Sequence, residues 1–369
     1  MRFLHVADTH VGHASFSRVD SRGLNQREQD VFAAFSRVVD LALAERVDFV
    51  LHAGDLFDSV RPTNRAVTFV MEEMARSVRG GVPWLVIAGN HESPRLRETG
   101  SVLRFLDFVP GVTAAYKGEA ETHVVGDCAV HLVPHVPTSE GYLAAVEAVR
   151  ARDTRWNVLA LHAGVHGVDR FGSGEFNEVV LPASALRADA DYVALGHYHR
   201  HTRVAGHAWY AGSTERTSVK EAAEEKGVML VDLAVGERRF VPIETRRWLD
   251  LPPVDCTGLA EVEIAPAIER ALRDVALDDA LVRLRVRGMP RPVHAALDHA
   301  RLRRLGESAL HVSLEMEVVD PEDRAQGEDA SVGALPVEWD AFVARAPAGP
   351  ERDDVRRLGL RFLEEATGA

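Results

Sequence analysis

The first half of the chain alternates between short apolar runs and longer segments that carry apolar residues at helical spacing. Buried strands that alternate with helices predict an α/β fold whose sheet is covered on both faces. The predicted strands are Phe3–Ala7, Val47–Ala53, Val82–Ala88, Trp156–Ala163 and Tyr192–Leu195, and the predicted helices between the first three are Gln26–Ala44 and Arg65–Val78.

The pattern changes after about Arg246, where Pro242, Pro252, Pro253 and Pro266 interrupt the chain. The segment that follows, 246–320, predicts a small α+β unit. Within it, Leu281–Arg287 alternates between polar and apolar residues, which predicts a half-buried strand with a basic exposed face. The arginines of that face are Arg283, Arg285 and Arg287, and the apolar residues opposite them are Val282, Leu284 and Val286.

The last segments differ again in composition. Acidic residues, Gly and Ala dominate Asp320–Pro336, so we expect a linker region over 321–350. A final helix is expected over 351–369, with its regular part at Asp353–Glu365. Val355, Leu358 and Phe362 form one apolar stripe along it. This helix either folds back onto the second domain or binds a partner. The predicted domains are therefore 1–245, 246–320, 321–350 and 351–369.

Composition narrows the functional classes. At 369 residues the chain fits two domains, and no stretch reaches the roughly 20 apolar residues that span a membrane. With only two cysteines and a first motif that begins at the N-terminus, we expect a cytoplasmic protein without disulfides, thiolate metal clusters or a signal peptide. The net charge of −13 argues against a general polyanion binder. However, seven arginines and one acid lie between Leu281 and Gly306, which reverses that sign locally.

Five short polar motifs each follow an apolar run. Because the carboxyl ends of neighbouring strands meet at one edge of an α/β sheet, loops far apart in sequence can converge there. Carboxylate, amide and imidazole ligands suit ions such as Mn, Fe or Zn, and two such ions about 3.5–4 Å apart can clamp a phosphodiester. The motifs are Asp8-Thr9-His10, Gly54-Asp55, Gly89-Asn90-His91-Glu92, His162 and Gly196-His197-Tyr198-His199. The candidate ligands are Asp8, His10, Asp55, Asn90, His162, His197 and His199.

Spacing suggests individual roles. Asp8 and His10 are two residues apart, so on an extended strand end both side chains would point to one side, and the two histidines of the last motif repeat this spacing. The carboxylate of Asp55 has enough lone pairs to bridge two ions, and Gly54 lets the backbone approach closely. His91, beside Asn90, could face the substrate and act as a general acid or stabilise developing charge.

Each motif alone has a simpler explanation as a turn or a core residue, and only their conjunction favours a metal site. His5 and His52 lie within strands and are expected to be core or supporting groups. The remaining histidines near the motifs, for which substrate contact stays open, are His13, His135, His166 and His201.

These motifs resemble those of the calcineurin-like metallophosphoesterases. Within that superfamily the chain is similar to the SbcD (Mre-eleven type) DNA repair nucleases, on the residues Arg2–His5, Gln26–Asp30 and Gly54–Asp58 followed by Arg61-Pro62. The resemblance implies a four-layer αββα sandwich with a smaller α+β capping domain and a C-terminal helical tail. It implies one ion, usually manganese, on Asp8, His10, Asp55 and His199, a second on Asp55, Asn90, His162 and His197, and His91 as the catalytic histidine.

The function implied is a two-metal DNA nuclease, exonuclease on double strands and endonuclease on single strands or hairpins, that repairs double-strand breaks with an SbcC-type SMC-like ATPase. Arg283, Arg285 and Arg287 would contact DNA, or pair with acids elsewhere. The alternatives are a small-molecule or protein phosphoesterase and a non-enzymatic scaffold. A homodimer is expected, and its interface or the core would take Val67, Val70, Met71 and Met74 together with Leu103 and Leu106.

Overall fold

The computed structural model of the chain describes residues 1–93, 100–168, 178–319, 335–345 and 352–367. The chain divides into two compact units that interleave along the sequence. The first consists of Met1–Pro252, Leu272–Leu284 and Arg301–Ser313, and the second of Pro253–Ala271, Arg285–Ala300 and Leu314–Ala369. The domain boundaries expected near residues 245 and 320 stay predictions.

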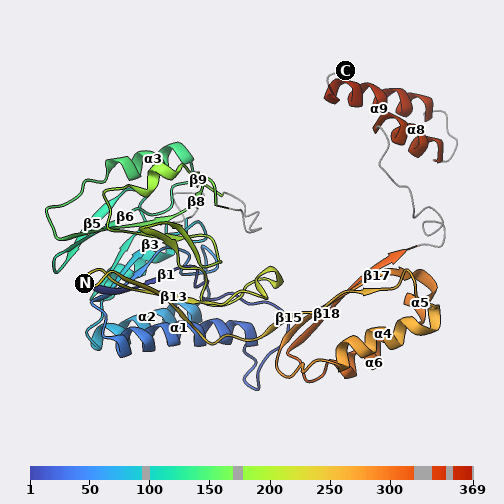
Figure 1. Cartoon of the computed structure of the whole chain (residues 1–369), viewed down its shortest axis with the longest axis horizontal. Coiled ribbons are helices and arrows are strands. Elements are labelled where there is room, and N and C mark those ends of the chain that lie inside the picture. Colours follow the sequence, from blue (N-terminus) through green and yellow to red (C-terminus); the bar gives the residue numbers. More distant parts are fainter. Residues whose placement is uncertain (94–99, 169–177, 320–334, 346–351, 368–369) are drawn as a thin grey trace. The chain divides into compact units, whose positions relative to one another are not determined.

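Two six-stranded sheets form the body of the first unit (Figure 1). In each sheet the central strands are parallel, and antiparallel strands lie at one edge of the first sheet and at both edges of the second. The first sheet has the order β14 (Glu237–Pro242), β13 (Gly227–Asp232), β1 (Arg2–Val6), β2 (Phe49–His52), β3 (Trp84–Ile87) and β4 (Val112–Ala115). The second has the order β11 (Thr202–Ala205), β12 (Ala208–Tyr210), β10 (Tyr192–Gly196), β7 (Trp156–His162), β6 (Cys128–Leu132) and β5 (Glu121–Val125).

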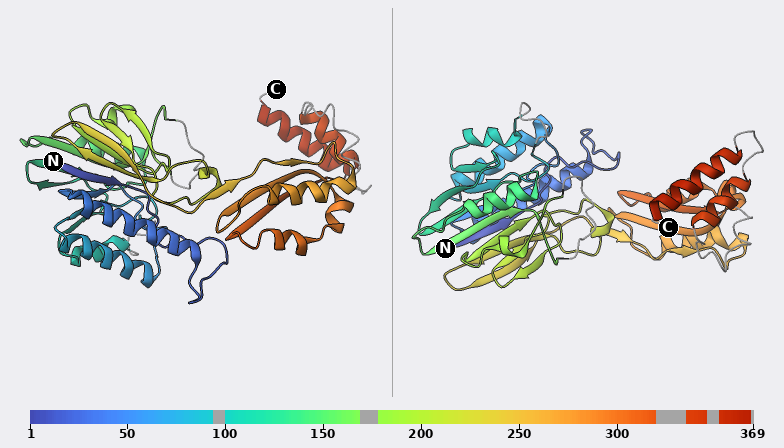
Figure 2. Two further views of the ribbon diagram at one scale, coloured as in Figure 1. Left: turned by 60° about the horizontal axis from the view of Figure 1, so that its bottom comes forward. Right: turned by 90° about the horizontal axis from the view of Figure 1, so that it is seen from above.

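Helices cover the outer face of each sheet, which gives four layers (Figures 1 and 2). The first sheet is covered by α1 (Gln26–Glu45), α2 (Asn64–Arg79) and the 3-10 helix η2 (Val102–Phe108). The second is covered by α3 (Ser139–Ala148), η3 (Ala183–Leu186) and the strand pair β8 (Gly164–Val165) and β9 (Val180–Leu181). The expected αββα sandwich is confirmed.

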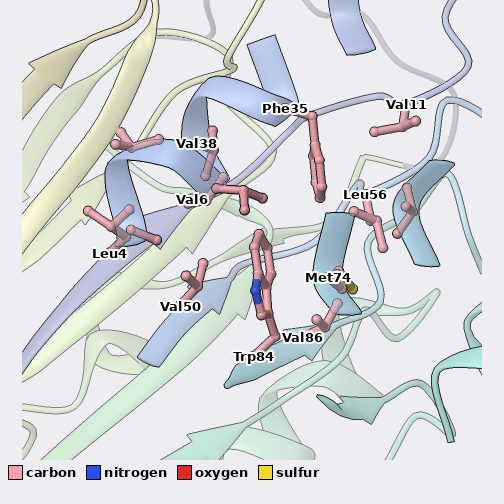
Figure 3. Packing of buried hydrophobic residues seen from close by; sticks show 14 of the residues in the cluster. Leu4, Val6, Val11, Phe35, Val38, Val50, Leu56, Met74, Trp84 and Val86 are labelled. Carbon is pink, nitrogen blue, oxygen red and sulfur yellow. The ribbon is translucent and has the colours of Figure 1, made fainter. Parts of the chain in front are cut away.

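The central strands β1, β2 and β3 of the first sheet are largely apolar because both of their faces are buried. In β1, Leu4 faces the helices α1 and α2, whereas Phe3 faces the second sheet. Trp84 of β3 lies in the helix-facing core, where its ring is 5.6 Å from that of Phe35 (Figure 3). The helix α1 begins after Asn25, whose side chain accepts hydrogen bonds from the first free backbone N–H groups.

A third sheet contains β15 (Trp248–Asp250), β17 (Leu281–Pro290), β16 (Val254–Asp255) and β18 (His311–Val319). In the sequence, helix α4 (Glu261–Arg273) lies between β16 and β17, and helices α5 (Arg291–Ala296) and α6 (His299–Leu305) lie between β17 and β18. The alternation predicted for β17 is confirmed. Its apolar residues Val282, Leu284 and Val286 are buried, whereas Arg287 is exposed and Arg283 and Arg285 are partly exposed.

The C-terminal part contains a helix that sequence reading missed. Helix α8 (Leu335–Arg345) lies inside the range 321–350 that was expected to be a linker, and α9 (Arg352–Thr367) matches the expected final helix. The indole N–H of Trp339 donates to the carbonyl of Arg356 at 3.1 Å, which fastens the two helices together. Residues 320–334 and 346–351 lie outside the described part. Among the described helices, none combines the length and apolar character needed to cross a membrane.

Candidate metal centre

The loops that follow β1, β2, β3 and β10, together with the last residue of β7, bring the candidate side chains together. Three overlapping groups have potential ligand atoms that all lie within 4.8 Å of one another. These groups are Asp8, His10 and His199; His10, Asp55 and His91; and Asp8, Asp55 and His162. Residues from both sheets therefore meet in one cluster, as the motif positions predicted.

One side of the cluster contains two facing imidazoles. Nε2 of His10 lies 3.0 Å from Nε2 of His199. Two nitrogen ligands on one ion, each bonded at about 2.0–2.1 Å, are separated by about 3 Å or slightly more. The carboxylate of Asp8 belongs to the same group, and both of its oxygens accept the backbone N–H of His197, at 3.0 and 3.1 Å. This side fits one divalent cation.

The other side gathers lone pairs around His162. Its Nδ1 donates to the carbonyl of Ala53 at 2.8 Å, which leaves the lone pair of Nε2 facing inward. That nitrogen lies 2.9 Å from Oδ1 of Asn90 and 3.2 Å from Oδ2 of Asp55. Nδ1 of His197 is 3.2 Å from the same Asn90 oxygen. With His162 neutral, its Nε2 lone pair and the oxygens of Asn90 and Asp55 converge on one place, so a second cation fits here.

Asp55 stands between the two sides. Its Oδ2 is 3.2 Å from His162, 3.8 Å from Nε2 of His10 and 3.9 Å from Nε2 of His91, and its Oδ1 accepts the backbone N–H of His91 at 3.0 Å. The side chain is 1% exposed. An oxygen with neighbours from both sides is placed as a bridging ligand would be.

The buried charges influence one another strongly. Burial raises the pKa of Asp8. Burial also disfavours the charged form of Asp55, but His162 outweighs it and holds the pKa of Asp55 well below its usual value. Burial alone would lower the pKa of His162, but the carboxylate of Asp55 has the larger, opposite effect, and the pKa is raised to about 9. A site with two buried carboxylates attracts cations.

Four of the candidate ligands have an unusual backbone conformation. The φ angles of Asp8, His10, Asp55 and His197 are 51°, 45°, 54° and 101°. Non-glycine residues rarely adopt positive φ, and each costs on the order of 1–3 kcal/mol. The expected extended geometry of Asp8 and His10 is therefore wrong, because their side chains converge through bends in the loop after β1 and not through strand alternation.

The glycines before the ligands are required by close contacts. Gly54 has φ +94°, and a Cβ there would overlap the ring of His162. A Cβ at Gly89 would overlap the carboxylate of Asp55. The motif glycines therefore let the loops after β2 and β3 approach the candidate ligands.

Sequence reading gave no role to several supporting residues. Glu92 is fully buried and accepts the backbone N–H of Phe57 at 2.6 Å and of Gly89 at 2.9 Å, which ties two ligand loops together. Burial and the nearby carboxylate of Asp55 raise the pKa of Glu92 to about 8. The carbonyl of Asp58 accepts Nδ1–H of His91 at 2.7 Å. Glu92 and Asp58 lie in or beside the motifs, and this position in the sequence was the only indication that they support the site.

The other histidines in or near the motifs are either core residues or candidates for contact with a substrate. His5 and His52 are fully buried, as expected for core residues, and burial lowers the pKa of each to about 3. His201 is 4.4 Å from the ring of Phe240 and contacts the carbonyl of Tyr210. Substrate contacts by these four stay predictions: His13, which pairs with Asp58; His135, which is buried; His166, which is exposed; and His201.

A family model described as calcineurin-like phosphoesterase matches residues 1–201. The chain belongs to this family of metal-dependent hydrolases. Curated relatives of the chain carry the name DNA double-strand break repair protein Mre11. The protein of Saccharolobus solfataricus is 31% identical over 55% of this chain and 51% of its own length. Those of Haloferax volcanii and Halobacterium salinarum are 33% and 30% identical over 78% of this chain, and over 61% and 70% of their own lengths.

Within the calcineurin-like phosphoesterases, the chain is an Mre11/SbcD-type member. Its match spans about half the length of the Saccharolobus solfataricus relative, which is 51% covered. The expected superfamily and branch are both confirmed.

Proposed function

We propose that this chain is a two-metal-dependent DNA nuclease, an exonuclease on double-stranded ends and an endonuclease on single strands or hairpins, that acts in double-strand break repair. The observation that supports it most directly is the sharing of Asp55 between two groups of inward-facing lone pairs. The names of the Mre11 relatives support DNA as the substrate.

In this proposal Asp8, His10, Asp55 and His199 hold one ion, and Asp55, Asn90, His162 and His197 hold the other. We propose Mn²⁺, which accepts both oxygen and nitrogen ligands. When bound, the two ions would polarise the phosphodiester and lower the pKa of a water molecule to make a nucleophile.

His91 is proposed as the catalytic histidine. Its Nδ1–H donates to Asp58, so its ring orientation is fixed and Nε2 is on the side of Asp55. Its side chain is 25% exposed, whereas that of Asp55 is 1% exposed, so His91 is accessible to a substrate that approaches the cluster. An imidazolium at this position would stabilise charge on the phosphate or protonate the leaving oxygen.

Labelled duplex, hairpin and single-stranded DNA, each incubated with Mn²⁺ beside a small phosphodiester ester, test this function. Cleavage of all three DNA substrates, abolished by a chelator, is expected. If only the small ester is cleaved, the chain is a small-molecule phosphoesterase. If neither DNA nor the small ester is cleaved, the chain is a non-enzymatic scaffold on this fold.

The arginines of β17 are proposed to contact DNA. We expect replacement of Arg283, Arg285 and Arg287 by Gln to weaken DNA binding and to reduce the slope of log affinity against log salt by up to about 0.9 for each lost phosphate contact. Arg283 forms a two-point ion pair with Asp250, at 2.8 and 3.0 Å, whereas Arg287 is exposed. The single variant of Arg287 should therefore account for more of the loss than that of Arg283.

Binding measured at several salt concentrations tests this prediction. Hydrolysis of a small phosphodiester should persist, because the metal cluster is untouched. A charge-matched control replaces Arg203, Arg238 and Arg239 on β11 and β14 by Gln. An equal loss of affinity in both triple variants would show that only total charge matters.

The helices α8 and α9 are proposed to bind an SbcC-type ATPase. Val355, Leu358 and Phe362 of α9 are 48%, 48% and 56% exposed, and Phe342 of α8 is 67% exposed. Apolar side chains gathered on one helix face are typical of an interaction surface.

We expect deletion of residues 351–369 to abolish co-purification with the ATPase while Mn²⁺-dependent nuclease activity remains. Because the deletion also removes the partner of Trp339, the variant Leu358→Asp with Phe362→Asp tests the same surface with the helix retained. Arg357→Ala, on an exposed side chain of the same helix, is the control. Binding that survives the Asp substitutions would contradict the proposal.

A homodimer is also proposed, but most of the expected interface residues are not available. Val70, Met74, Leu103 and Leu106 are fully buried in the core beneath α2 and η2, which is the intramolecular alternative. Met71 remains 37% exposed. The molar mass of the chain in solution tests the dimer.

A further inference from the structure

Lys226 is a fully buried lysine beside the metal cluster, and the two-metal function gives it no role. Lysine is almost never fully buried unless it is paired. Its ammonium group lies 2.9 Å from the carbonyl of His199, 2.6 Å from Oε2 of Glu221 and 2.9 Å from Oε2 of Glu224. An ammonium has three protons, and here each has one acceptor.

Glu221 connects this lysine to the ring of His199. Its Oε1 accepts Nδ1–H of His199 at 3.2 Å and the hydroxyl of Thr217 at 2.8 Å. The other ring nitrogen of His199, Nε2, faces Nε2 of His10 in the metal cluster. Lys226 therefore holds His199 twice, directly through its backbone carbonyl and through Glu221 at its ring.

We propose that Glu221 and Lys226 are positioning residues, which hold the imidazole of His199 with the Nε2 lone pair directed into the metal site. The inference rests on the proposed two-metal function. A hydrogen bond from the outer nitrogen to a carboxylate fixes the tautomer and the ring orientation and makes the inner nitrogen a better ligand. The ion pair with Lys226 holds the carboxylate of Glu221 in place.

The backbone behind these side chains is fixed as well. Arg216 donates from Nε to the carbonyl of Glu221 at 3.2 Å and from Nη2 to the carbonyl of Glu224 at 2.5 Å. Its Nη1 donates to the hydroxyl of Thr245 at 2.6 Å. The short helix η4 (Val219–Glu221) is thereby tied to the chain that leaves the first sheet. Both carboxylates that contact Lys226 sit on a segment held at several points.

Titration of Mn²⁺ alone into the full chain by calorimetry tests the proposal. The wild-type chain is expected to bind two ions. Glu221→Ala should weaken one of the two sites by about 10–100-fold and leave the other unchanged, and Glu221→Gln, which can still accept from Nδ1–H, should weaken it less. Equal affinity of both sites in Glu221→Ala would overturn the positioning role.

A purely structural ion pair is distinguished by two further variants. Removing one partner of a buried pair destabilises a protein, whereas removing both is often neutral. The double variant Glu221→Gln with Lys226→Met should therefore unfold at a higher temperature than Lys226→Met alone, yet keep the weakened Mn²⁺ site. If the double variant recovered both the melting temperature and the Mn²⁺ affinity, the ion pair would serve stability only.

Arg187→Met is the matched control. Arg187 is another paired cation, which lies 2.6 Å from Asp189, donates to the carbonyl of Val149 at 2.6 Å and contacts neither the candidate ligands nor the Glu221 segment. Its loss should lower the melting temperature without changing either Mn²⁺ affinity. A change in one Mn²⁺ site in Arg187→Met as large as that in Glu221→Ala would contradict the inference. A wild-type chain that binds no Mn²⁺ would overturn the proposed function itself, and this inference with it.

Discussion

We expect Asp55→Asn to abolish phosphodiester hydrolysis while the chain remains folded. The Oδ1 atom that accepts the N–H of His91 is retained, and the new amide N–H₂ would stand where Oδ2 lies, 3.2 Å from Nε2 of His162. That amide can donate to the imidazole, so the hydrogen bonds persist. The bridging negative charge is lost, however, and an N–H₂ group is not a metal ligand.

The effect should be large because Asp55 belongs to both proposed ion sites. Enzymes accelerate their reactions by about 10⁶-fold or more, and in a two-metal enzyme the ions supply much of that acceleration. Activity should fall to the background rate, and calorimetry should show fewer than two bound Mn²⁺ ions. Asp48→Asn, at an exposed residue immediately before β2, is the control. Turnover within tenfold of the wild-type rate in Asp55→Asn would contradict the bridging role.

The central strands were predictable because their residues are apolar on both faces. The expected strand Trp156–Ala163 and the observed β7, Trp156–His162, differ by one residue, and the expected helix Gln26–Ala44 ends one residue before α1 does. Strand ends also located the motifs correctly, since loops that follow parallel strands share one edge. The clustering of the candidate ligands followed from these two regularities.

The edges of the sheets were not predictable in the same way. Strand β14, Glu237–Pro242, carries polar residues, and its antiparallel pairing with β13 joins segments that no short-range pattern connects to β1. Helix α8 was missed because the linker, predicted from the acidic, Gly- and Ala-rich residues before this helix, was drawn too far along the chain. These elements depend on partners distant in sequence, which local periodicity does not report.

The spacing of the motif residues in the sequence also could not predict the backbone geometry and the supporting contacts of the site. Asp8 and Asp55 have positive φ in two loops that run side by side, where the N–H of Asp8 donates to the carbonyl of Gly54 at 3.0 Å. The Lys226–Glu221 pair approaches His199 from η4 and from the residue before β13, with no motif to mark it. Such supporting contacts are fixed by tertiary structure, so the spacing of residues in the sequence does not indicate them.

His91→Ala is expected to separate turnover from metal binding. His91 is not among the seven proposed ligands, and its backbone N–H, which contacts Asp55, remains after the substitution. Both Mn²⁺ ions should therefore still bind with wild-type affinity. The imidazole that is proposed to face the substrate is lost, and general acid–base groups contribute about 10²–10⁴-fold to the rate, so turnover should fall by that factor.

The two quantities should be measured on the same preparation of His91→Ala, with the metal content determined by calorimetry and the rate determined on duplex DNA. The loss should also depend on the leaving group. An ester whose leaving oxygen is a weak base needs little protonation, so its hydrolysis should be less impaired than that of DNA if His91 is the proton donor. His123→Ala, on the partly exposed strand β5, is the control for removing an imidazole. Loss of a Mn²⁺ ion would instead identify His91 as a ligand, in keeping with its place in the group with His10 and Asp55, and unchanged turnover would remove it from the mechanism.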